Sequence, residues 1–309
     1  MRCRSNISAK RKLKFANEPP KKNKKINNCG PDKHYGMSLA EPDMSEEELE
    51  KECQLYLEKL KCRVSNSEDR DHIQQMTRDQ HGSVDWRELR KTMLTASNFG
   101  EVIKRRPSTH CHNLVKRLLY HKKINSKAVI YGRTHEDDAV QLYIQEMTKH
   151  DINDMQVQQC KLYIDLEHPY LDATPDRLLG NDAVIEIKCL PSLIEVENPF
   201  EKPPSNACFV VENGTIRLKR NHKYYFQVQY NFCDLVIFIN EDKGIRVQRI
   251  QKDEVLWKTK MLPLLKEFYL KFMLPDIVDS RVNRGLRLRD CANDKEGSIF
   301  DEPLACLLE

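Results

Sequence analysis

The chain has 309 residues, of which 39% are hydrophobic and 32% are charged, and its formal net charge is +4. This length suits one large domain with appendages. No apolar run reaches about 18 residues, so we expect no transmembrane helix, and the basic start of the chain lacks the apolar segment of a secretory signal.

Cysteine usage argues for a reducing, intracellular compartment. The chain has eleven cysteines, an odd number, and none of them forms a C-x-x-C pair. This pattern argues against a disulfide framework. His110-Cys111-His112 suggests zinc, but no second pair of ligands stands at a useful spacing, and we therefore predict no zinc site.

Residues 1–44 are predicted to form a disordered tail with separated charges. Residues 1–36 carry eleven lysines and arginines against two acidic residues, whereas residues 37–58 carry one lysine against eight acidic residues. The two basic clusters fit a bipartite-like nuclear import signal or a nucleic-acid tether, and we predict a nuclear protein. The alternative is a solvated tail without a targeting role. The cluster residues are Lys10, Arg11, Lys12, Lys21, Lys22, Lys24 and Lys25.

Residues 45–80 are predicted to be a helix and a polar linker. Ser45 followed by Glu48 is typical of a capping box, which predicts that the helix starts at this point. The apolar stripe of the helix predicts that it packs on the main domain or binds a partner. The stripe consists of Leu49, Cys53, Tyr56, Leu57 and Leu60.

Residues 81–275 are predicted to form the folded domain, and residues 276–309 a weakly specified tail. The order of helices and strands predicts an α/β fold with a mixed central sheet flanked by helices. Asn213-Gly214 is typical of a type I′ hairpin turn. The predicted helices are 86–92, 97–104, 111–122, 133–149, 222–234 and 253–272. The predicted strands are 156–165, 170–173, 176–179, 183–189, 234–240 and 245–250.

Arg90 and Ser97 form the first candidate site along the chain. Ser97 stands where a helix is predicted to begin, and helix N-termini bind anions. An arginine fork together with a hydroxyl would hold a terminal phosphate. The alternative is that Ser97 is a plain N-cap.

Glu136 is the next candidate. It shares a predicted helix face with Ala139, Val140, Tyr143 and Met147. A carboxylate on an apolar stripe needs a partner, and a metal ion would be one. The alternative is a helix-start acid that is favoured by the helix dipole and by Arg133.

The segment from Pro175-Asp176 to Glu186-Ile187-Lys188 carries most of the functional information. Strand alternation places Glu186 and Lys188 on one face and Ile187 on the other. A turn between the two parts would form a hairpin and bring Asp176 close to Glu186. Two carboxylates and a lysine at one place suit a Mg²⁺-dependent phosphodiesterase. The alternative is an ordinary amphipathic edge strand whose charges face solvent.

Gln227 is predicted to share a helix face with Tyr224 and Tyr230. On a core-facing stripe, its amide could hydrogen-bond a water molecule or a carboxylate ligand. The alternative is a buried amide whose hydrogen bonds are satisfied within the core.

Five segments together resemble the YqaJ-type viral recombinase domain, which is similar to phage lambda exonuclease within the PD-(D/E)XK nuclease superfamily. The resemblance covers roughly residues 85–250 and implies a restriction-endonuclease-like core. The segments, in chain order, are RELRKTMLTASNFGEVI, YGRTHEDDAV, HPYLDATPDRLL, VIEIKC and KYYFQVQYNF.

The resemblance also implies a role for each matching residue. Asp176 and Glu186 would bind Mg²⁺, or Mn²⁺ in its place, with the Ile187 carbonyl as a third ligand. Lys188 would act on the attacking water. Glu136 would lie at a second metal position or hydrogen-bond the waters of the metal. Gln227 would position the attacking water or Lys188. Arg90 and Ser97 would bind the 5′-phosphate.

The family pattern differs in two places from this chain. Arg177 stands where the family often has glycine, and it would contact a phosphate or crowd the turn. The segment 190–219 is longer than a minimal connection and could be a substrate loop.

We therefore predict a Mg²⁺-dependent deoxyribonuclease, specifically a 5′-to-3′ exonuclease of double-strand DNA ends that serves recombination, repair or a mobile element. One alternative is a structure-specific or endonucleolytic enzyme. The other is a catalytically silent DNA-binding module. Phage relatives form ring-shaped trimers, so a homo-trimer or a recombination partner is also to be tested.

Overall fold

The computed structural model describes residues 42–65, 84–106, 109–120, 126–150, 156–160, 162–180 and 183–289, together with residues 68, 73 and 77. The predicted nuclear-targeting clusters and most of the linker lie outside the described residues, as do residues 290–309. Among the described residues, no helix has the length and apolarity needed to cross a bilayer.

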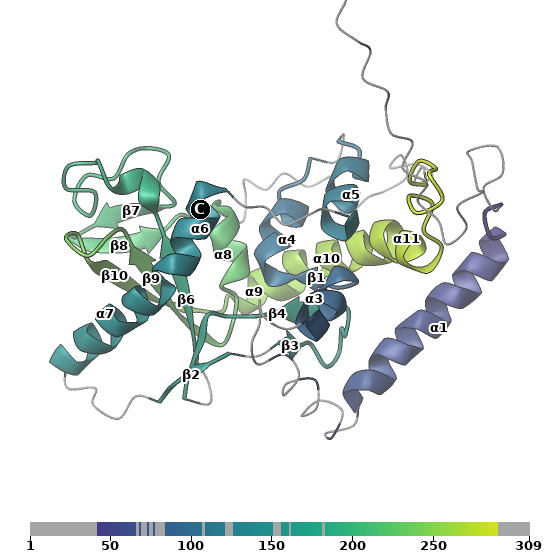
Figure 1. Cartoon of the computed structure of the whole chain (residues 1–309), viewed down its shortest axis with the longest axis horizontal. Coiled ribbons are helices and arrows are strands. Elements are labelled where there is room, and N and C mark those ends of the chain that lie inside the picture. Colours follow the sequence, from purple (N-terminus) through teal and green to yellow (C-terminus); the bar gives the residue numbers. More distant parts are fainter. Residues whose placement is uncertain are drawn as a thin grey trace, which may run out of the picture.

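A five-stranded mixed sheet organises the half of the molecule drawn on the left of Figure 1. Its strand order is β10-β9-β6-β5-β2. The central strand β6 runs parallel to β9 and antiparallel to β5. The strands are β2 (Val157–Gln159), β5 (Arg177–Leu179), β6 (Ala183–Cys189), β9 (Phe232–Phe238) and β10 (Ile245–Gln251).

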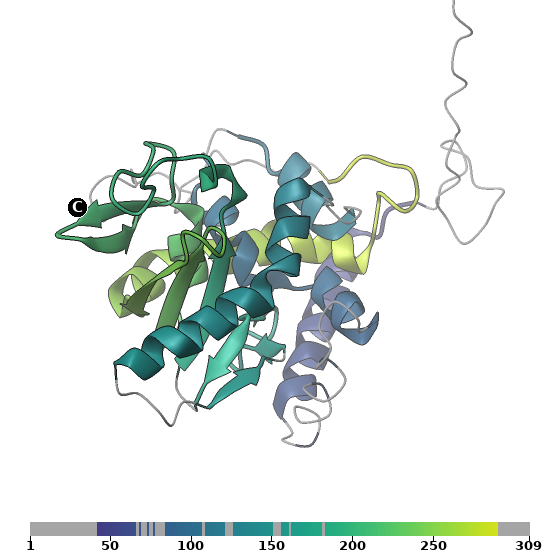
Figure 2. The ribbon, with the colours of Figure 1, turned by 60° about the vertical axis from the view of Figure 1, so that its left-hand side comes forward.

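Different elements cover the two faces of this sheet. Ile185 and Ile187 pack against α7 (Glu136–Lys149), which follows α6 (Lys127–Thr134) and lies across the sheet in Figure 2. Val184, on the opposite face, packs with β7 (Phe209–Glu212), β8 (Thr215–Leu218) and the 3-10 turn η2 (Pro191–Leu193). Asn213 and Gly214 have φ of 50° and 77°, as the predicted hairpin turn requires. The mixed α/β fold with flanking helices is confirmed.

A helical layer and a three-stranded sheet of order β1-β4-β3 make up the other half. The strands are β1 (Leu94–Thr95), β3 (Tyr163–Ile164) and β4 (Leu171–Ala173), and the N-terminal helices are α3 (Val84–Lys91), α4 (Ala96–Ile103) and α5 (His112–Tyr120). The C-terminal run is α9 (Glu254–Leu256), η3 (Trp257–Met261), α10 (Leu262–Phe268), η4 (Tyr269–Met273) and α11 (Leu274–Val278). Its buried side chains pack against α4 in the largest core cluster of the described residues.

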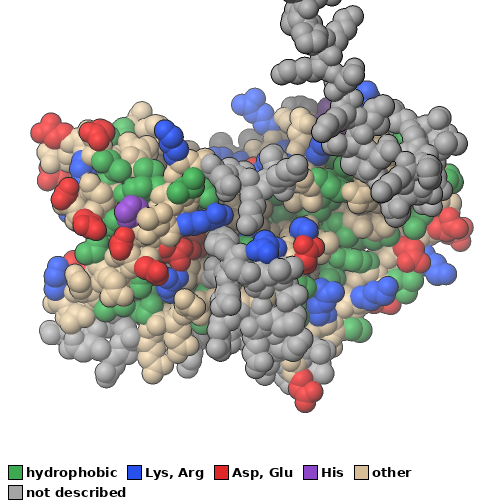
Figure 3. All heavy atoms as spheres, in the orientation of Figure 1, with side chains coloured by type: hydrophobic (Ala, Val, Ile, Leu, Met, Phe, Trp, Pro, Cys, Tyr) green, Lys and Arg blue, Asp and Glu red, His purple; other side chains and the backbone are tan. Residues whose placement is uncertain are grey.

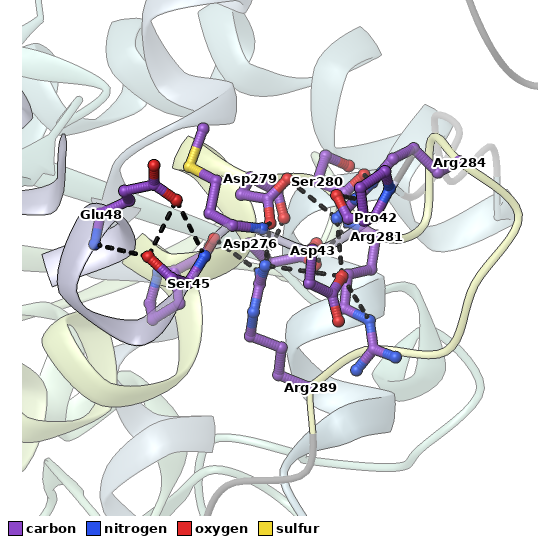
Figure 4. A network of polar contacts seen from close by, with 12 residues as sticks. Pro42, Asp43, Ser45, Glu48, Asp276, Asp279, Ser280, Arg281, Arg284 and Arg289 are labelled. Carbon is purple, nitrogen blue, oxygen red and sulfur yellow. Dashed lines mark hydrogen bonds and ion pairs between the residues drawn. The ribbon is translucent and has the colours of Figure 1, made fainter. Parts of the chain in front are cut away.

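Helix α1 (Glu46–Ser65) starts with the predicted capping box. The Glu48 N–H donates to Ser45 Oγ at 3.3 Å, and the Ser45 N–H donates to Glu48 Oε2 at 3.1 Å. Just before this helix, Asp43 forms ion pairs with Arg281 and Arg284 near the end of the described chain (Figure 4). Leu60 is buried in the main core, as the apolar stripe predicted.

Three predicted elements have different bounds. The predicted helix 222–234 is the short α8 (Lys223–Gln227), since the apolar run from Phe232 pairs on both sides as a central strand. The prediction that Tyr230 shares the helix face of Gln227 is therefore wrong. The predicted helix 133–149 breaks at His135 into α6 and α7, and the predicted strand 156–165 divides into β2 and β3, which belong to different sheets.

Candidate active site

The β5–β6 hairpin brings Asp176 and Glu186 together. Gly180, at φ +60°, lies in the turn, and Arg177 pairs with Ile185 across the two strands. The residue before Arg177 therefore lies at the level of Glu186. Asp176 Oδ2 accepts a hydrogen bond from the Ile187 N–H at 2.6 Å. Because β6 has a neighbour on each side, the alternative of an exposed edge strand is wrong.

Glu186 is the most buried acidic residue of the site, with 2% of its surface exposed. Its Oε1 accepts hydrogen bonds from Lys188 Nζ at 2.6 Å and from Gln227 Nε2 at 2.5 Å. Its Oε2 is buried without a hydrogen-bond partner in the described part of the chain. A buried carboxylate oxygen is costly without a partner, and a cation would satisfy it.

Lys188 is held between this carboxylate and an aromatic ring. Its Nζ lies 4.7 Å from the centroid of Tyr224, the first contact of the site that the sequence did not indicate. Burial lowers the pKa of Lys188, but the attraction of Glu186 and Asp176 outweighs burial and raises that pKa overall. Lys188 is therefore an ammonium group here, and only the neutralisation of its carboxylate neighbours would make it a base.

Asp176 is destabilised as a carboxylate. Burial, followed by repulsion from Glu186, raises its pKa well above the usual range. Added positive charge would relieve both residues, so this donor set fits a hard divalent cation. No group of three or more acidic, histidine or cysteine side chains suited to a metal ion occurs among the described residues. Asp176 and Glu186 suit Mg²⁺ instead, because that ion commonly binds one or two carboxylates and keeps several waters.

Glu136 lies close to this pair, but an arginine balances its charge. Arg177 Nη1 donates to Glu136 Oε1 and to the Asp176 carbonyl, each at 2.6 Å, and its Nη2 donates to Asp137 Oδ1 at 2.6 Å. Arg177 therefore binds α7 to the start of β5. The two expectations for Arg177, a phosphate contact or a crowded turn, did not include this role. The helix-start reading of Glu136 correctly places it at the first turn of α7.

Ser97 lies in the first turn of α4, and Arg90, in the last turn of α3, has protein partners. Its Nε donates to Asp172 Oδ2 at 3.2 Å, its Nη2 donates to Thr95 Oγ1 at 2.6 Å, and its guanidinium lies 4.2 Å from the centroid of Trp86. Burial raises the pKa of Asp172 to about 6, against the pull of Arg90. No sequence pattern indicated this buried aspartate.

Ser97 is exposed in the first turn of α4. Thr95, rather than Ser97, occupies the N-cap position of that helix, so the plain N-cap alternative for Ser97 is wrong. The proposed phosphate role of Arg90 and Ser97 stays a prediction.

The chain matches a known domain family over the region that contains this site. Residues 85–233 match the family model described as the YqaJ-like viral recombinase domain. The resemblance drawn from the sequence motifs is thereby confirmed. No curated protein was found to match the sequence.

The chain is also similar to several solved structures, among them two of one exonuclease and one of a complex with DNA. The alkaline exonuclease LHK-Exo from Laribacter hongkongensis is 21% identical, with a TM-score of 0.45 over 65% of this chain and 97% of that chain. LHK-Exo in complex with dAMP is 20% identical, with a TM-score of 0.43 over 62% and 92%. A SOX–DNA complex is 12% identical, with a TM-score of 0.41 over 72% and 79%.

Proposed function

We propose that the protein is a metal-dependent DNA nuclease that hydrolyses phosphodiester bonds. The observation that carries this proposal is the carboxylate pair of half-buried Asp176 and buried Glu186, which meets Lys188 and Gln227 at the centre of the sheet with one carboxylate oxygen unsatisfied. The match of residues 85–233 to a recombinase domain supports it.

Each residue of the site has a distinct part in this reaction. Asp176 and Glu186 would hold the metal, with the Ile187 carbonyl as a further ligand. The bound ion would activate water and offset negative charge on the phosphate. Gln227 fixes the orientation of Glu186 through its hydrogen bond. Once its carboxylate neighbours are neutralised, Lys188 would release its own proton to solvent, and could then orient the attacking water and accept the proton of that water.

We propose Mg²⁺ as the ion, with Mn²⁺ as its substitute. A second metal position, or a hydrogen bond to metal-bound water, is the role we propose for Glu136. Its ion pair with Arg177 means that the Arg177 side chain must share Glu136 with any such ligand.

The substrate that we propose is a double-strand DNA end, degraded from the 5′ side. This preference rests on Arg90 and Ser97 as the 5′-phosphate pocket. Since Arg90 already pairs with Asp172, the phosphate would have to compete with or join that contact. Comparison of ends with and without a 5′-phosphate tests this pocket: faster digestion of the phosphorylated end supports it, and equal rates oppose it.

The central experiment compares linear duplex DNA with closed circular DNA in the presence of Mg²⁺. We expect loss of the linear DNA alone, and we expect Lys188→Ala and Glu186→Gln to abolish it while Lys149→Ala, an exposed lysine at the far end of α7, has no effect. Cleavage of the circle would favour an endonuclease. Failure to cleave either DNA with Mg²⁺ or Mn²⁺, by a folded protein that binds DNA, would instead favour a silent binding module.

For the cell, we propose nuclear localisation and a role in recombination, repair or a mobile element. The two basic clusters at Lys10–Lys12 and Lys21–Lys25 support this. A fluorescent reporter fused to residues 1–44 should enter the nucleus, and substitution of both clusters by alanine should prevent entry. Sedimentation of the full chain would test the proposed homo-trimer.

A further inference from the structure

A basic groove lies on the other side of α8 from the candidate active site. Its volume is about 1020 Å³, and β8, β10, the end of α4 and residues 219–221 contribute to its lining. Four cationic side chains and two acidic ones line it, an excess of two positive charges. The cations are Lys104, Arg217, Lys219 and Arg220.

Much of this positive charge is not balanced by acidic partners. Lys104 Nζ donates to the Asn221 carbonyl at 2.6 Å, and Lys219 Nζ donates to the Ser205 carbonyl at 2.7 Å. Both acceptors are neutral. Arg217 is 4.0 Å from Glu212, and both side chains are more than half exposed, so solvent screens that pair.

The remaining arginine of the groove is anchored. Arg220 pairs with Asp253 at 2.8 Å. Such a fixed guanidinium group stays in place for a ligand, and a planar donor fork suits phosphate oxygens. The Arg249 guanidinium belongs to the opposite face of the sheet, where it binds Asp234, a carboxylate that also accepts from Tyr143 of α7.

Acidic and basic side chains are mixed over the rest of the exposed surface of this half, where Lys127, Arg133, Lys149, Lys202 and Arg246 are exposed beside the acidic residues. Figure 3 shows acidic side chains gathered over the left-hand part, where α6 and α7 cover the sheet. Exposed acidic residues of this half include Asp137, Asp138, Glu195, Glu197, Glu201, Glu241 and Asp242. A polyanion would be repelled by these acidic side chains and drawn to the groove.

One short helix separates the groove from the candidate active site. Tyr225 and Phe226 line the groove, whereas their neighbours Tyr224 and Gln227 contact Lys188 and Glu186. Burial, and then the charges of Lys104, Lys223, Lys219 and Lys188, lower the pKa of His222 to about 4, so lysines of both the groove and the site act on this ring.

We infer that this groove binds the phosphodiester backbone of a single nucleic-acid strand that extends past the active site. This inference rests on the proposed nuclease function, because the strand in the groove would be part of the DNA that the active site cleaves. Backbone contacts without base readout, beside a partly accessible tyrosine, suit a single strand of any sequence.

The test is fluorescence anisotropy of a labelled single-stranded oligonucleotide at several salt concentrations. We expect the double variant Arg217→Gln and Lys219→Gln to weaken binding, and to reduce the slope of log K against log salt by about 1.4, the value for two lost phosphate contacts on a single strand. The matched control is Lys258→Gln with Lys271→Gln, two exposed lysines on the C-terminal helical run, which should leave both quantities unchanged.

Glu212→Gln gives the opposite test, which misfolding would not imitate. Removal of this acidic residue from the groove should tighten binding of the single strand. Unchanged binding in the double variant, or an equal loss in both control and groove variants, would overturn the inference. A loss confined to duplex probes would overturn the assignment to a single strand.

Cleavage by the Lys188 variant decides the nuclease function separately from these binding measurements. If the wild type cleaves no DNA but the groove variant binds the single strand more weakly, the groove proposal stands and the nuclease proposal fails. If the wild type cleaves DNA but all variants bind the single strand equally, the nuclease proposal stands and the groove proposal fails.

Discussion

At the scale of single residues, the site shows a conflict between stability and function. Asp176 is half-buried beside the buried Glu186, and the carboxylate form of Asp176 is disfavoured first by desolvation and then by Glu186. Such arrangements persist where a ligand compensates them, and their removal often stabilises a protein.

We therefore predict that Asp176→Asn raises the stability of the metal-free protein by roughly 0.5–2 kcal/mol, although it abolishes cleavage. Asparagine keeps an oxygen that can accept from the Ile187 N–H. Urea unfolding measures the gain, and Mg²⁺ should raise the melting temperature of the wild type more than that of the variant. Equal Mg²⁺ responses would argue against a metal at Asp176.

Arg177 gives a second prediction at this scale. Its side chain is only 10% exposed and joins Glu136 to the start of β5. Arg177→Met should cost about 1–3 kcal/mol, because it leaves partly buried acceptors unpaired. Lys149→Met, which removes an exposed pair, should cost under about 1 kcal/mol. Chemical denaturation of both variants checks this, and similar losses would contradict it.

His222 links stability to pH. Its ring accepts a hydrogen bond from the Tyr224 N–H, and burial together with nearby lysines lowers its pKa from 6.5 to about 4. Between these two pH values the unfolded chain binds a proton that the folded chain excludes, so this residue makes stability fall as the pH falls from 6.5 towards 4.

The variant His222→Asn should reduce that dependence, since asparagine keeps the cap without titrating. Urea unfolding of wild type and variant across this pH range provides the measurement. If the free energy of unfolding of the two proteins depended on pH in the same way, the pKa of His222 would not be lowered by burial and by the lysines around it.

At the scale of elements, close packing between α4 and α8 positions Gln227. A Cβ on Gly100 would lie 2.7 Å from the backbone of Lys223 in α8. Real Cβ atoms essentially never make contacts that short, so only glycine at position 100 lets α4 and α8 pack this closely. This packing holds α8, and with it Gln227, at the active site.

Gly100→Ala should therefore destabilise the protein by about 1–3 kcal/mol and lower activity through displacement of α8. The matched control is Gly132→Ala in α6, where a Cβ meets no atom within 4 Å, and it should stabilise the protein by about 1 kcal/mol. Thermal unfolding of the two variants should shift in opposite directions; shifts of the same sign would refute the packing argument.

At the scale of the whole molecule, the two ends of the described chain are joined. Asp43 pairs with Arg281 and Arg284, and Asp279 pairs with Arg284 and Arg289 (Figure 4). These contacts hold the start of α1 against the segment that follows α11.

Asp43→Asn should cost under about 1 kcal/mol because Asp43 is 41% exposed, whereas Asp279→Asn should cost more because Asp279 is 11% exposed. Limited proteolysis should cut residues 279–289 faster in both variants without loss of nuclease activity. An unchanged rate of cleavage in Asp279→Asn would contradict the role of this network.

The local sequence pattern was sufficient to predict the strand that carries Glu186 and Lys188. The alternation from Val184 to Lys188 determined which side chains are buried together, because neighbouring strand residues must face opposite sides of a sheet. The capping box at Ser45 and the Asn213-Gly214 turn were also readable, since each depends on contacts only a few residues apart.

Only the tertiary structure decided which distant groups meet. Helix α8 ends at Gln227 because the residues from Phe232 pair as β9 with two other strands. The choice between helix and strand for these residues therefore depends on partners far along the chain, which no local pattern indicates. The partners of Arg177 and Arg90 come from helices and strands far along the chain, as do the walls of the basic groove. The order of residues thus specifies which reactive groups this protein has, and long-range packing decides where each charge lies.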